Sequence, residues 1–557
     1  MAEQNVKMMF HVKVPMRDGV TLSADIYMPD GPGPFPTILV RTPYDNNGSV
    51  GKGRLCASRG YAFVAQDCRG RYDSDGNFYP WHQEADDGFD TQEWIAKQPW
   101  CNGKIGMVGG SYLGLVQWLS AMRGSKRLTC IAPRVITSNF YDSPNYGGGA
   151  FQLALNMLWG FRMLGRVNQN VDHYDWCKLF RALPLITADE QAGRHVKHWK
   201  DWVSHPSYDD YWKEVSVEEN YEKITVPALI MGGWYDLYSK QVFTNFNGMT
   251  QRGGSESARK GTRLIVGAWP HPLSASTKTG EVDFGPDSKI DLEAVEDQWL
   301  ERYLKGNESA AIQDAPIRLF IMGRNIWRDE REWPLARTEW TNYYFHSRGG
   351  ANSLLGDGVL STETPSDEPP DRFTYDPHTP VPTMGGNNCC APNILPWGPY
   401  DQRPTERRQD VLVYTTDPME EDLEVTGPIV VKLYASSSAR DSDFTGKLLD
   451  VYPCGYAMNL CDGILRARYR ESFEKAKFMR PGKVYEFTID LWVTGNVFRK
   501  GHRIRVDISS SNFPRFDRNP NTGHDFGMDA EIREARQVVH HDRKYPSHIV
   551  LPVIPAR

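Results

Sequence analysis

KIGMVGGSYLGLVQWLSAM, residues 104–122, joins a strand pattern to a helix pattern through one small-residue turn and so points to the fold class. An apolar run ends at Gly109 and Gly110, Ser111 follows, and residues 115–122 have helical periodicity. Strand, sharp turn and helix in this order form a nucleophile elbow, whose strained serine needs small neighbours. Ser111 is therefore the candidate nucleophile.

The turn departs from the strict G-x-S-x-G pattern at one position. Leu113 stands where that pattern has a glycine, and the glycine is displaced to Gly114. A bare G-x-S is also compatible with a glycine-rich turn after a strand that carries an incidental serine. The other members of a catalytic set must therefore decide between these two interpretations.

Two later segments predict the base and its orienting acid. A serine hydroxyl becomes a good nucleophile when a histidine takes its proton and a carboxylate fixes the tautomer of that histidine. VPALIMGGWYD ends an apolar run with Asp236, and RLIVGAWPH ends another with His271, in the chain order that this fold uses. Asp236 is also compatible with the N-cap of a helix over 241–246, a role that does not exclude the catalytic one.

Two rival carboxylates precede the serine. Asp67 and Asp75 lie in the charge-mixed segment QDCRGRYDSDG, residues 66–76, and we interpret them as ion-paired loop residues.

A tetrahedral intermediate needs two hydrogen-bond donors for its oxygen. The residue after the nucleophile supplies its backbone N–H, which here belongs to Tyr112. The second donor normally comes from the loop after the third strand, and here that loop, RTPYD, offers the Tyr44 hydroxyl. With an ordinary pKa near ~10, a phenol is protonated at neutral pH and can donate. On the residues alone, a tyrosine in this place is more often a packing aromatic.

Patterning along the chain predicts three kinds of structure. Apolar runs alternate with amphipathic stretches over 1–144 and again over 224–336, which predicts one α/β domain with a parallel sheet. The segment 145–223 is rich in aromatic residues, with a helix-like stretch at 149–164 and no convincing strand, and it predicts a helical cap inserted into that domain. Period-two alternation between turn signals over 337–557 predicts a β-sandwich or jelly roll.

Composition and charge exclude several function classes. The net charge of −6, from 64 basic and 70 acidic residues, comes without a basic stripe, so we expect no nucleic-acid partner. No stretch approaches the ~18 apolar residues of a membrane span. No phosphate loop, zinc spacing or dinucleotide fingerprint occurs, so we expect neither a cofactor nor a metal. The expected partner is a small-molecule ester or amide, and a homo-oligomer is compatible with the sequence.

The cysteines and the first residues favour a cytoplasmic protein. Nine cysteines, an odd number without paired C-x-x-C spacing, argue against a disulfide framework or a zinc site. Residues 1–22 interrupt their apolar residues with charged ones, so no secretion signal is expected there. We interpret the adjacent Cys389 and Cys390 as buried or idle thiols, with a redox pair as the alternative.

Five motifs occur together in one order: RTPYD, QDCRG, GGSYLG, GGWYD and GAWPH. In this order they resemble the cocaine-esterase-like branch of the X-Pro dipeptidyl-peptidase superfamily, which also includes α-amino-acid ester hydrolases and glutaryl acylases. The resemblance continues through residues 425–453 and 501–523, so it covers nearly the whole chain. It implies an α/β-hydrolase core, a helical cap and a carboxyl-terminal jelly roll.

The resemblance also implies residue roles. Ser111 would be the nucleophile, His271 the general base and Asp236 its orienting acid, with Tyr44 and the Tyr112 amide as the oxyanion hole. The elbow of this family reads G-x-S-Y-x-G, which accounts for the displaced glycine. The implied activity is hydrolysis of a carboxylic ester or amide through an acyl-enzyme.

The substrate pocket is expected among aromatic side chains of the cap and of the loop after the acid. The candidates are Tyr141, Phe151, Trp159 and Tyr238. Ordinary helix packing explains each of these four residues equally well.

The motifs leave the substrate class open. Ester and amide hydrolases use the same triad, whereas X-Pro peptidases and amino-acid ester hydrolases also need carboxylates that hold a substrate ammonium. Asp209 and Asp210 are candidates for that task, although solvated cap residues are the simpler interpretation. A non-catalytic binding protein is a remote alternative, because all five catalytic positions carry competent residue types.

Overall fold

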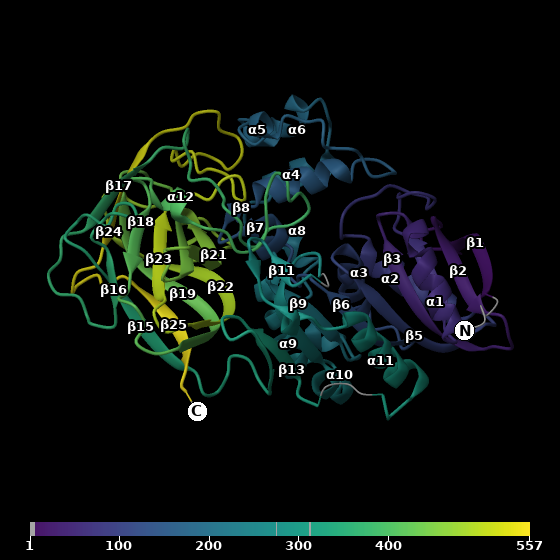
Figure 1. Ribbon diagram of the computed structural model, residues 1–557. Coiled ribbons are helices and arrows are strands. Elements are labelled where there is room, and N and C mark those ends of the chain that lie inside the picture. Colours follow the sequence, from purple (N-terminus) through teal and green to yellow (C-terminus); the bar gives the residue numbers. More distant parts are fainter. Residues whose placement is uncertain (1–5, 274–275, 311–313, 557) are drawn as a thin grey trace.

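The computed structural model describes residues 6–273, 276–310 and 314–556. Figure 1 shows an α/β part, coloured purple to teal, lying beside a β-rich part coloured green to yellow. One cluster of buried apolar side chains runs through both parts. The predicted combination of an α/β core with a β-rich carboxyl-terminal part is therefore confirmed.

The α/β part is built on a mixed sheet. Its ten strands within the described ranges follow the order β1-β2-β4-β3-β5-β6-β9-β10-β13-β14. Neighbours from β4 through β13 pair in parallel, whereas β1 with β2, β2 with β4, and β13 with β14 pair antiparallel. The strands are β1 (Val6–Pro15), β2 (Thr21–Pro29), β3 (Phe35–Thr42), β4 (Ala62–Asp67), β5 (Cys101–Gly110), β6 (Leu128–Arg134), β9 (Leu229–Tyr235), β10 (Arg263–Pro270), β13 (Ile317–Ile321) and β14 (Ile326–Glu330).

Both faces of this sheet are buried, because successive side chains of a strand point to opposite sides. In β3, Leu39 belongs to one apolar cluster, while Ile38 and Val40 belong to the other. Helices α2, α3 and α9 cover the first face and α1 and α11 the second. The helices of this part are α1 (Val50–Ser58), α2 (Glu84–Ala96), α3 (Tyr112–Ala121), α9 (Ser239–Arg252), α10 (Glu256–Gly261) and α11 (Leu292–Lys305).

The segment between β6 and β9 forms the predicted helical insertion, with one difference. The short strands β7 (Tyr146–Gly147) and β8 (Ala150–Phe151) come first, so the helix expected over 149–164 begins only at Leu153. Gly148 and Gly149 have positive φ and form the turn between these strands, and the Gly148 carbonyl accepts from the Arg466 amide. The helices are α4 (Leu153–Arg162), α5 (Trp176–Leu179), α6 (Ala188–Gln191), α7 (Lys197–Ser204) and α8 (Asp210–Lys213).

The carboxyl-terminal part is a second, mainly antiparallel sheet, in which only β16 and β18 pair in parallel among the described residues. Strand β22 pairs with β19 and also packs across β20 and β21, so the sheet folds back over itself. The elements are β15 (Glu339–His346), β16 (Val359–Ser361), β17 (Asp371–Tyr375), α12 (Arg403–Glu406), β18 (Leu412–Thr415), β19 (Leu423–Ser437), β20 (Asp443–Val451), β21 (Ala457–Arg466), β22 (Tyr485–Phe498), β23 (Arg503–Ser509), β24 (Ala535–His540) and β25 (His548–Ile554). A small hairpin, β11 (Lys278–Thr279) and β12 (Val282–Asp283), follows β10.

None of the helices within the described ranges combines the length and the apolar composition needed to cross a membrane.

Candidate active site

Ser111 lies in the sharp turn between β5 and α3, as the sequence predicts. Its φ of 57° and ψ of −127° are a strained backbone conformation for a residue with a side chain. Two glycines make the turn possible: a Cβ at Gly109 would lie 2.6 Å from the Cβ of Leu113, and one at Gly114 would lie 3.0 Å from the Arg134 carbonyl oxygen. The displaced Gly114 thus allows α3 to pack closely against the end of β6.

The structure brings Ser111, His271 and Asp236 together. Asp236 directly follows β9 and His271 directly follows β10, and these neighbouring parallel strands end at the same edge of the sheet as β5. His271 Nδ1 lies 2.7 Å from Asp236 Oδ1, and His271 Nε2 lies 3.0 Å from Ser111 Oγ. Because the buried carboxylate accepts the Nδ1 proton, the lone pair of neutral His271 faces the serine hydroxyl.

Asp236 is not the N-cap of the following helix. Helix α9 begins at Ser239, Tyr238 occupies the capping position, and the Asp236 side chain points to His271 instead.

The Tyr44 hydroxyl accepts a hydrogen bond from a neighbouring indole, so its own proton can be donated to another group. Trp159 Nε1 donates to Tyr44 Oη at 3.0 Å, so the phenol oxygen is the acceptor in that contact. Burial raises the pKa of Tyr44 to about 12, which keeps the phenol protonated at neutral pH. Tyr44 lines the same cavity as Ser111, and its O–H is therefore available to a substrate oxygen.

The Tyr112 amide is the first N–H of α3, where a helix leaves its amide groups without internal partners. A hydrogen bond holds the side chain of Tyr112 in place, since its hydroxyl donates to Glu84 Oε1 at 2.8 Å. Glu84 in turn pairs with Arg41, whose Nη1 lies 2.8 Å from Glu84 Oε2. Burial raises the pKa of Glu84, and Arg41 opposes that rise. No local motif indicates this buried Arg41–Glu84–Tyr112 network, because its members lie far apart in the chain.

Two of the four predicted pocket aromatics line the cavity beside the serine. Trp159 and Tyr238 line it, whereas Tyr141 and Phe151 do not. Tyr141 is buried against Tyr146 and donates to the Pro206 carbonyl. Phe151, which precedes α4, packs on Trp199 instead. The predictions that Tyr141 and Phe151 line the pocket were wrong, because aromatic density in a sequence does not show which side of a helical layer faces the substrate.

The cavity has an empty volume of about 440 Å³ and mixes aliphatic, aromatic and sulfur-containing side chains. Several lining residues come from outside the cap, and no sequence signal pointed to them. Its lining is formed by Tyr44, Trp81, Ser111, Tyr112, Leu115, Ile136, Phe140, Pro144, Leu155, Asn156, Trp159, Tyr238, Cys389 and Cys390.

Four other carboxylates that the sequence offered as candidates, Asp67, Asp75, Asp209 and Asp210, do not line this cavity. Asp209 caps α8 and accepts from His205 Nδ1, and Asp210 lies in the first turn of that helix, as expected for cap residues. Asp75 Oδ2 lies 3.8 Å from Lys13 Nζ, as expected for an ion-paired loop residue. Asp67 is different from the expectation, because it is buried at the end of β4 and accepts backbone N–H groups of Asn46 and Asp73. Burial raises the pKa of Asp67 to about 7.

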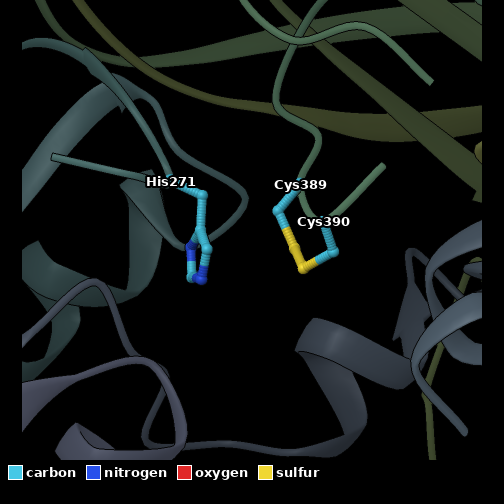
Figure 2. A group of neighbouring side chains, drawn as sticks. All are labelled: His271, Cys389 and Cys390. Carbon is cyan, nitrogen blue, oxygen red and sulfur yellow. A yellow bond between two sulfur atoms is a disulfide. The ribbon is translucent and has the colours of Figure 1, made fainter. Parts of the chain in front are cut away.

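Cys389 and Cys390 form a disulfide, so their interpretation as idle thiols was wrong. Figure 2 shows this disulfide facing the His271 ring from a separate segment of the chain. One nitrogen of His271 and the two sulfurs all lie within 4.8 Å of one another, a grouping of metal-ligand type. The nearby Asn387 anchors the segment: its Nδ2 donates to the carbonyl oxygens of Trp234 and Asp236 at 2.8 and 2.9 Å.

Comparisons with protein families match both parts of the chain. Residues 18–272 match the family described as X-Pro dipeptidyl-peptidase (S15 family). Residues 309–550 match the X-Pro dipeptidyl-peptidase C-terminal non-catalytic domain.

Whole-length relatives carry the same two parts. The chain is 37% identical over 582 residues to the cocaine esterase of Rhodococcus sp. (strain MB1 Bresler), with 100% of each chain covered. An aminopeptidase from a marine sediment archaeon, Thaumarchaeota archaeon, has a TM-score of 0.85 at 26% identity, covering 99% of this chain and 97% of its own. An α-amino acid ester hydrolase has a TM-score of 0.84 with the same identity and coverage.

Proposed function

Because the chain belongs to the cocaine-esterase-like branch of the X-Pro dipeptidyl-peptidase (S15) family and is a serine-dependent ester hydrolase, we propose that Ser111, His271 and Asp236 are its catalytic triad. The observation that carries this assignment is the chain of short contacts from Asp236 Oδ1 through the imidazole to Ser111 Oγ. Tyr44 and the Tyr112 amide would form the oxyanion hole.

In acylation, Ser111 Oγ attacks the carbonyl carbon of the substrate while its proton moves to His271 Nε2. The carbonyl oxygen becomes an oxyanion, which accepts from the Tyr44 O–H and from the Tyr112 N–H. Buried Asp236 stabilises the imidazolium through Nδ1–H. The intermediate collapses when Nε2–H protonates the leaving alkoxide, which departs as the alcohol.

In deacylation, the same groups act on water. His271 Nε2 takes a proton from the water as its oxygen attacks the acyl carbon, and the oxyanion returns to the same two donors. Ser111 leaves with the proton from Nε2, and the carboxylic acid is released.

We infer that the acyl group of the substrate is neutral and largely apolar. Among the described residues that line the cavity, none is a carboxylate, and the polar groups are hydroxyls, two indoles and the amide of Asn156. Burying a substrate ammonium in such a site without a carboxylate partner is unfavourable. This lining supports ester hydrolysis of a neutral acid over X-Pro dipeptidyl-peptidase or α-amino-acid ester hydrolase activity.

A comparison of three substrates tests this inference. We expect the kcat/KM for a p-nitrophenyl ester of benzoic or butyric acid to exceed that for an alanine p-nitrophenyl ester and for Ala-Pro p-nitroanilide. The N-acetylalanine ester serves as the control, because it keeps the alanine skeleton and replaces the ammonium by an uncharged amide. A preference for either ammonium-bearing substrate would overturn the inference.

We also propose that the chain divides into a core of residues 1–144 and 224–336, a cap of 145–223 and a jelly roll of 337–557. The change of sheet between β14 and β15, and the folding of β22 across β20 and β21, support these limits.

A cytoplasmic location is proposed from the seven free cysteines, of which Cys177 and Cys454 are exposed. Fractionation of cells that produce the protein would test the location.

A further inference from the structure

The Cys389–Cys390 disulfide forms part of the wall of the substrate cavity, opposite the base of the triad. Both cysteines line the cavity that contains Ser111, and Cys389 is buried. Figure 2 shows that the sulfurs and His271 come from different segments and face each other. The proposed mechanism of ester hydrolysis does not use these sulfur atoms.

The loop that carries the two cysteines is held by hydrogen bonds that do not involve sulfur. Asn387 binds the carbonyl oxygens of Trp234 and Asp236. Asn388 Nδ2 donates at 2.8 Å to the carbonyl oxygens of Gly385 and of Pro396. The two sulfurs are thus kept beside His271 by the backbone around them, whatever their oxidation state.

His271 is already oriented as a metal ligand. Metal-binding histidines usually donate their second ring N–H to a carboxylate, a backbone carbonyl or a water, which fixes the ring and leaves the other nitrogen for the ion. Asp236 accepts from Nδ1 of His271 in this way, so the lone pair of Nε2 is directed into the site. The three ligand-type atoms of His271, Cys389 and Cys390 lie within 4.8 Å of one another.

We propose that reduction of the Cys389–Cys390 disulfide creates an inhibitory site for a thiophilic divalent cation of the zinc group, held by the two thiolates and His271 Nε2. With bonds of about 2.0–2.3 Å in a tetrahedron, the ligands of such an ion lie roughly 3.5–4 Å apart. Breaking the S–S bond lets the sulfurs separate to that spacing.

The redox step balances with a small thiol or a phosphine as the reductant. With a phosphine, phosphorus attacks one sulfur, the S–S bond breaks, and the other sulfur leaves as a thiolate. Water then attacks phosphorus, which releases the second thiol and forms the phosphine oxide. Two electrons pass from phosphorus to the sulfur pair, and binding of the cation releases the thiol protons.

Occupation of the site stops turnover, because a metal on Nε2 removes the lone pair that takes the serine proton. This inhibition rests on the proposed role of His271, whereas binding of the cation does not. The disulfide form has no thiolate ligands, so oxidation protects the base.

The experiment uses the full-length chain carrying Cys177→Ser and Cys454→Ser, which removes the two exposed free thiols. The protein is prepared oxidised, or reduced with a phosphine that is then removed by desalting, and both forms are titrated with Cd²⁺. Ultraviolet cadmium–thiolate absorbance reports binding, and hydrolysis of a p-nitrophenyl ester reports inhibition. The reduced form should bind one equivalent and lose activity in parallel, at a Cd²⁺ concentration at least about tenfold below that for the oxidised form.

A further variant, Cys389→Ser/Cys390→Ser in the same background, should show neither the absorbance nor the reduction-dependent inhibition. Equal Cd²⁺ sensitivity of oxidised and reduced protein, or persistence of the response in this variant, would overturn the proposal. One equivalent bound to the two thiolates without loss of activity would overturn the inhibitory role of the site, and labelling of Ser111 by a fluorophosphonate in the same protein would show whether the triad itself is intact. Absence of binding with normal esterase activity would overturn the metal site alone.

Discussion

The individual residues of the candidate site are side chains that directly follow strands. Ser111, Asp236 and His271 each follow an apolar run of the sequence, and each lies at the same edge of the sheet. Strand periodicity could predict them for this reason, since parallel strands present their carboxyl ends together. Tyr44 follows β3 at this edge in the same manner.

Replacing Tyr44 by phenylalanine tests the oxyanion donor. Tyr44→Phe should raise the barrier of ester hydrolysis by roughly 2–4 kcal/mol, because one of two donors to the oxyanion is lost. Steady-state kinetics should show this as a lower kcat, with little change in the thermal midpoint. A wild-type kcat in this variant would exclude the donor role.

Trp159 tests selectivity at the same scale. Trp159→Ala enlarges the cavity and removes the indole N–H that donates to Tyr44. We expect the ratio of kcat/KM values for benzoate and acetate esters to change by several-fold, because one lining aromatic no longer contacts the larger acyl group. Trp176→Ala is a matched control, since Trp176 is buried in the cap but does not line the cavity. Unchanged selectivity in Trp159→Ala would contradict a substrate contact.

Among the helices and strands, those of the helical insertion were the hardest to predict from the sequence. Its helical character was predictable from composition, but the start of α4 was not, because the turn at Gly148 depends on a contact with Arg466. The direction in which each aromatic side chain points was equally unpredictable, as Tyr141 and Phe151 show, since neither lines the cavity. Helix periodicity shows that a face is apolar, but not which neighbour covers it.

Two helices of the insertion, α4 and α7, are joined by a titratable contact. His198 Nε2 donates to the Gly160 carbonyl at 3.0 Å, and burial lowers the pKa of His198 to about 4. The folded state therefore keeps the imidazole neutral, while the unfolded state binds a proton below its ordinary pKa of 6.5. This contribution to stability is complete above pH 6.5 and is lost as the pH falls toward 4.

Urea unfolding at pH 7 and pH 5 measures that contribution. Between these values the wild type should lose roughly 2 kcal/mol of unfolding free energy that His198→Gln does not lose, because glutamine can donate to Gly160 without titrating. An identical loss in both proteins would show that His198 is not the responsible group.

At the scale of the whole molecule, the carboxyl-terminal part completes the active site. Asn387 and the two cysteines reach the catalytic edge from a segment more than a hundred residues beyond His271. No periodicity or local motif encodes such a contact, so the sequence predicted the β-rich part and gave no sign of its role in the cavity.

Asn387→Ala tests that role. The change removes the hydrogen bonds to the loop that carries Asp236, and the resulting displacement should lower kcat/KM by about tenfold to 10²-fold. Asn388→Ala is the matched control, because the amide of Asn388 donates to the carbonyl oxygens of Gly385 and Pro396 in its own loop, and not to those of Trp234 and Asp236. Equal losses of kcat/KM in the two variants would mean that Asn387 does not position the acid.

Covalent labelling tests directly whether Ser111 is the nucleophile. After incubation with a fluorophosphonate, intact mass and peptide mapping should show one adduct on Ser111, and neither Ser111→Ala nor His271→Ala should label at an appreciable rate. A stoichiometric adduct on another residue, or ester hydrolysis by Ser111→Ala at the wild-type rate, would contradict the account.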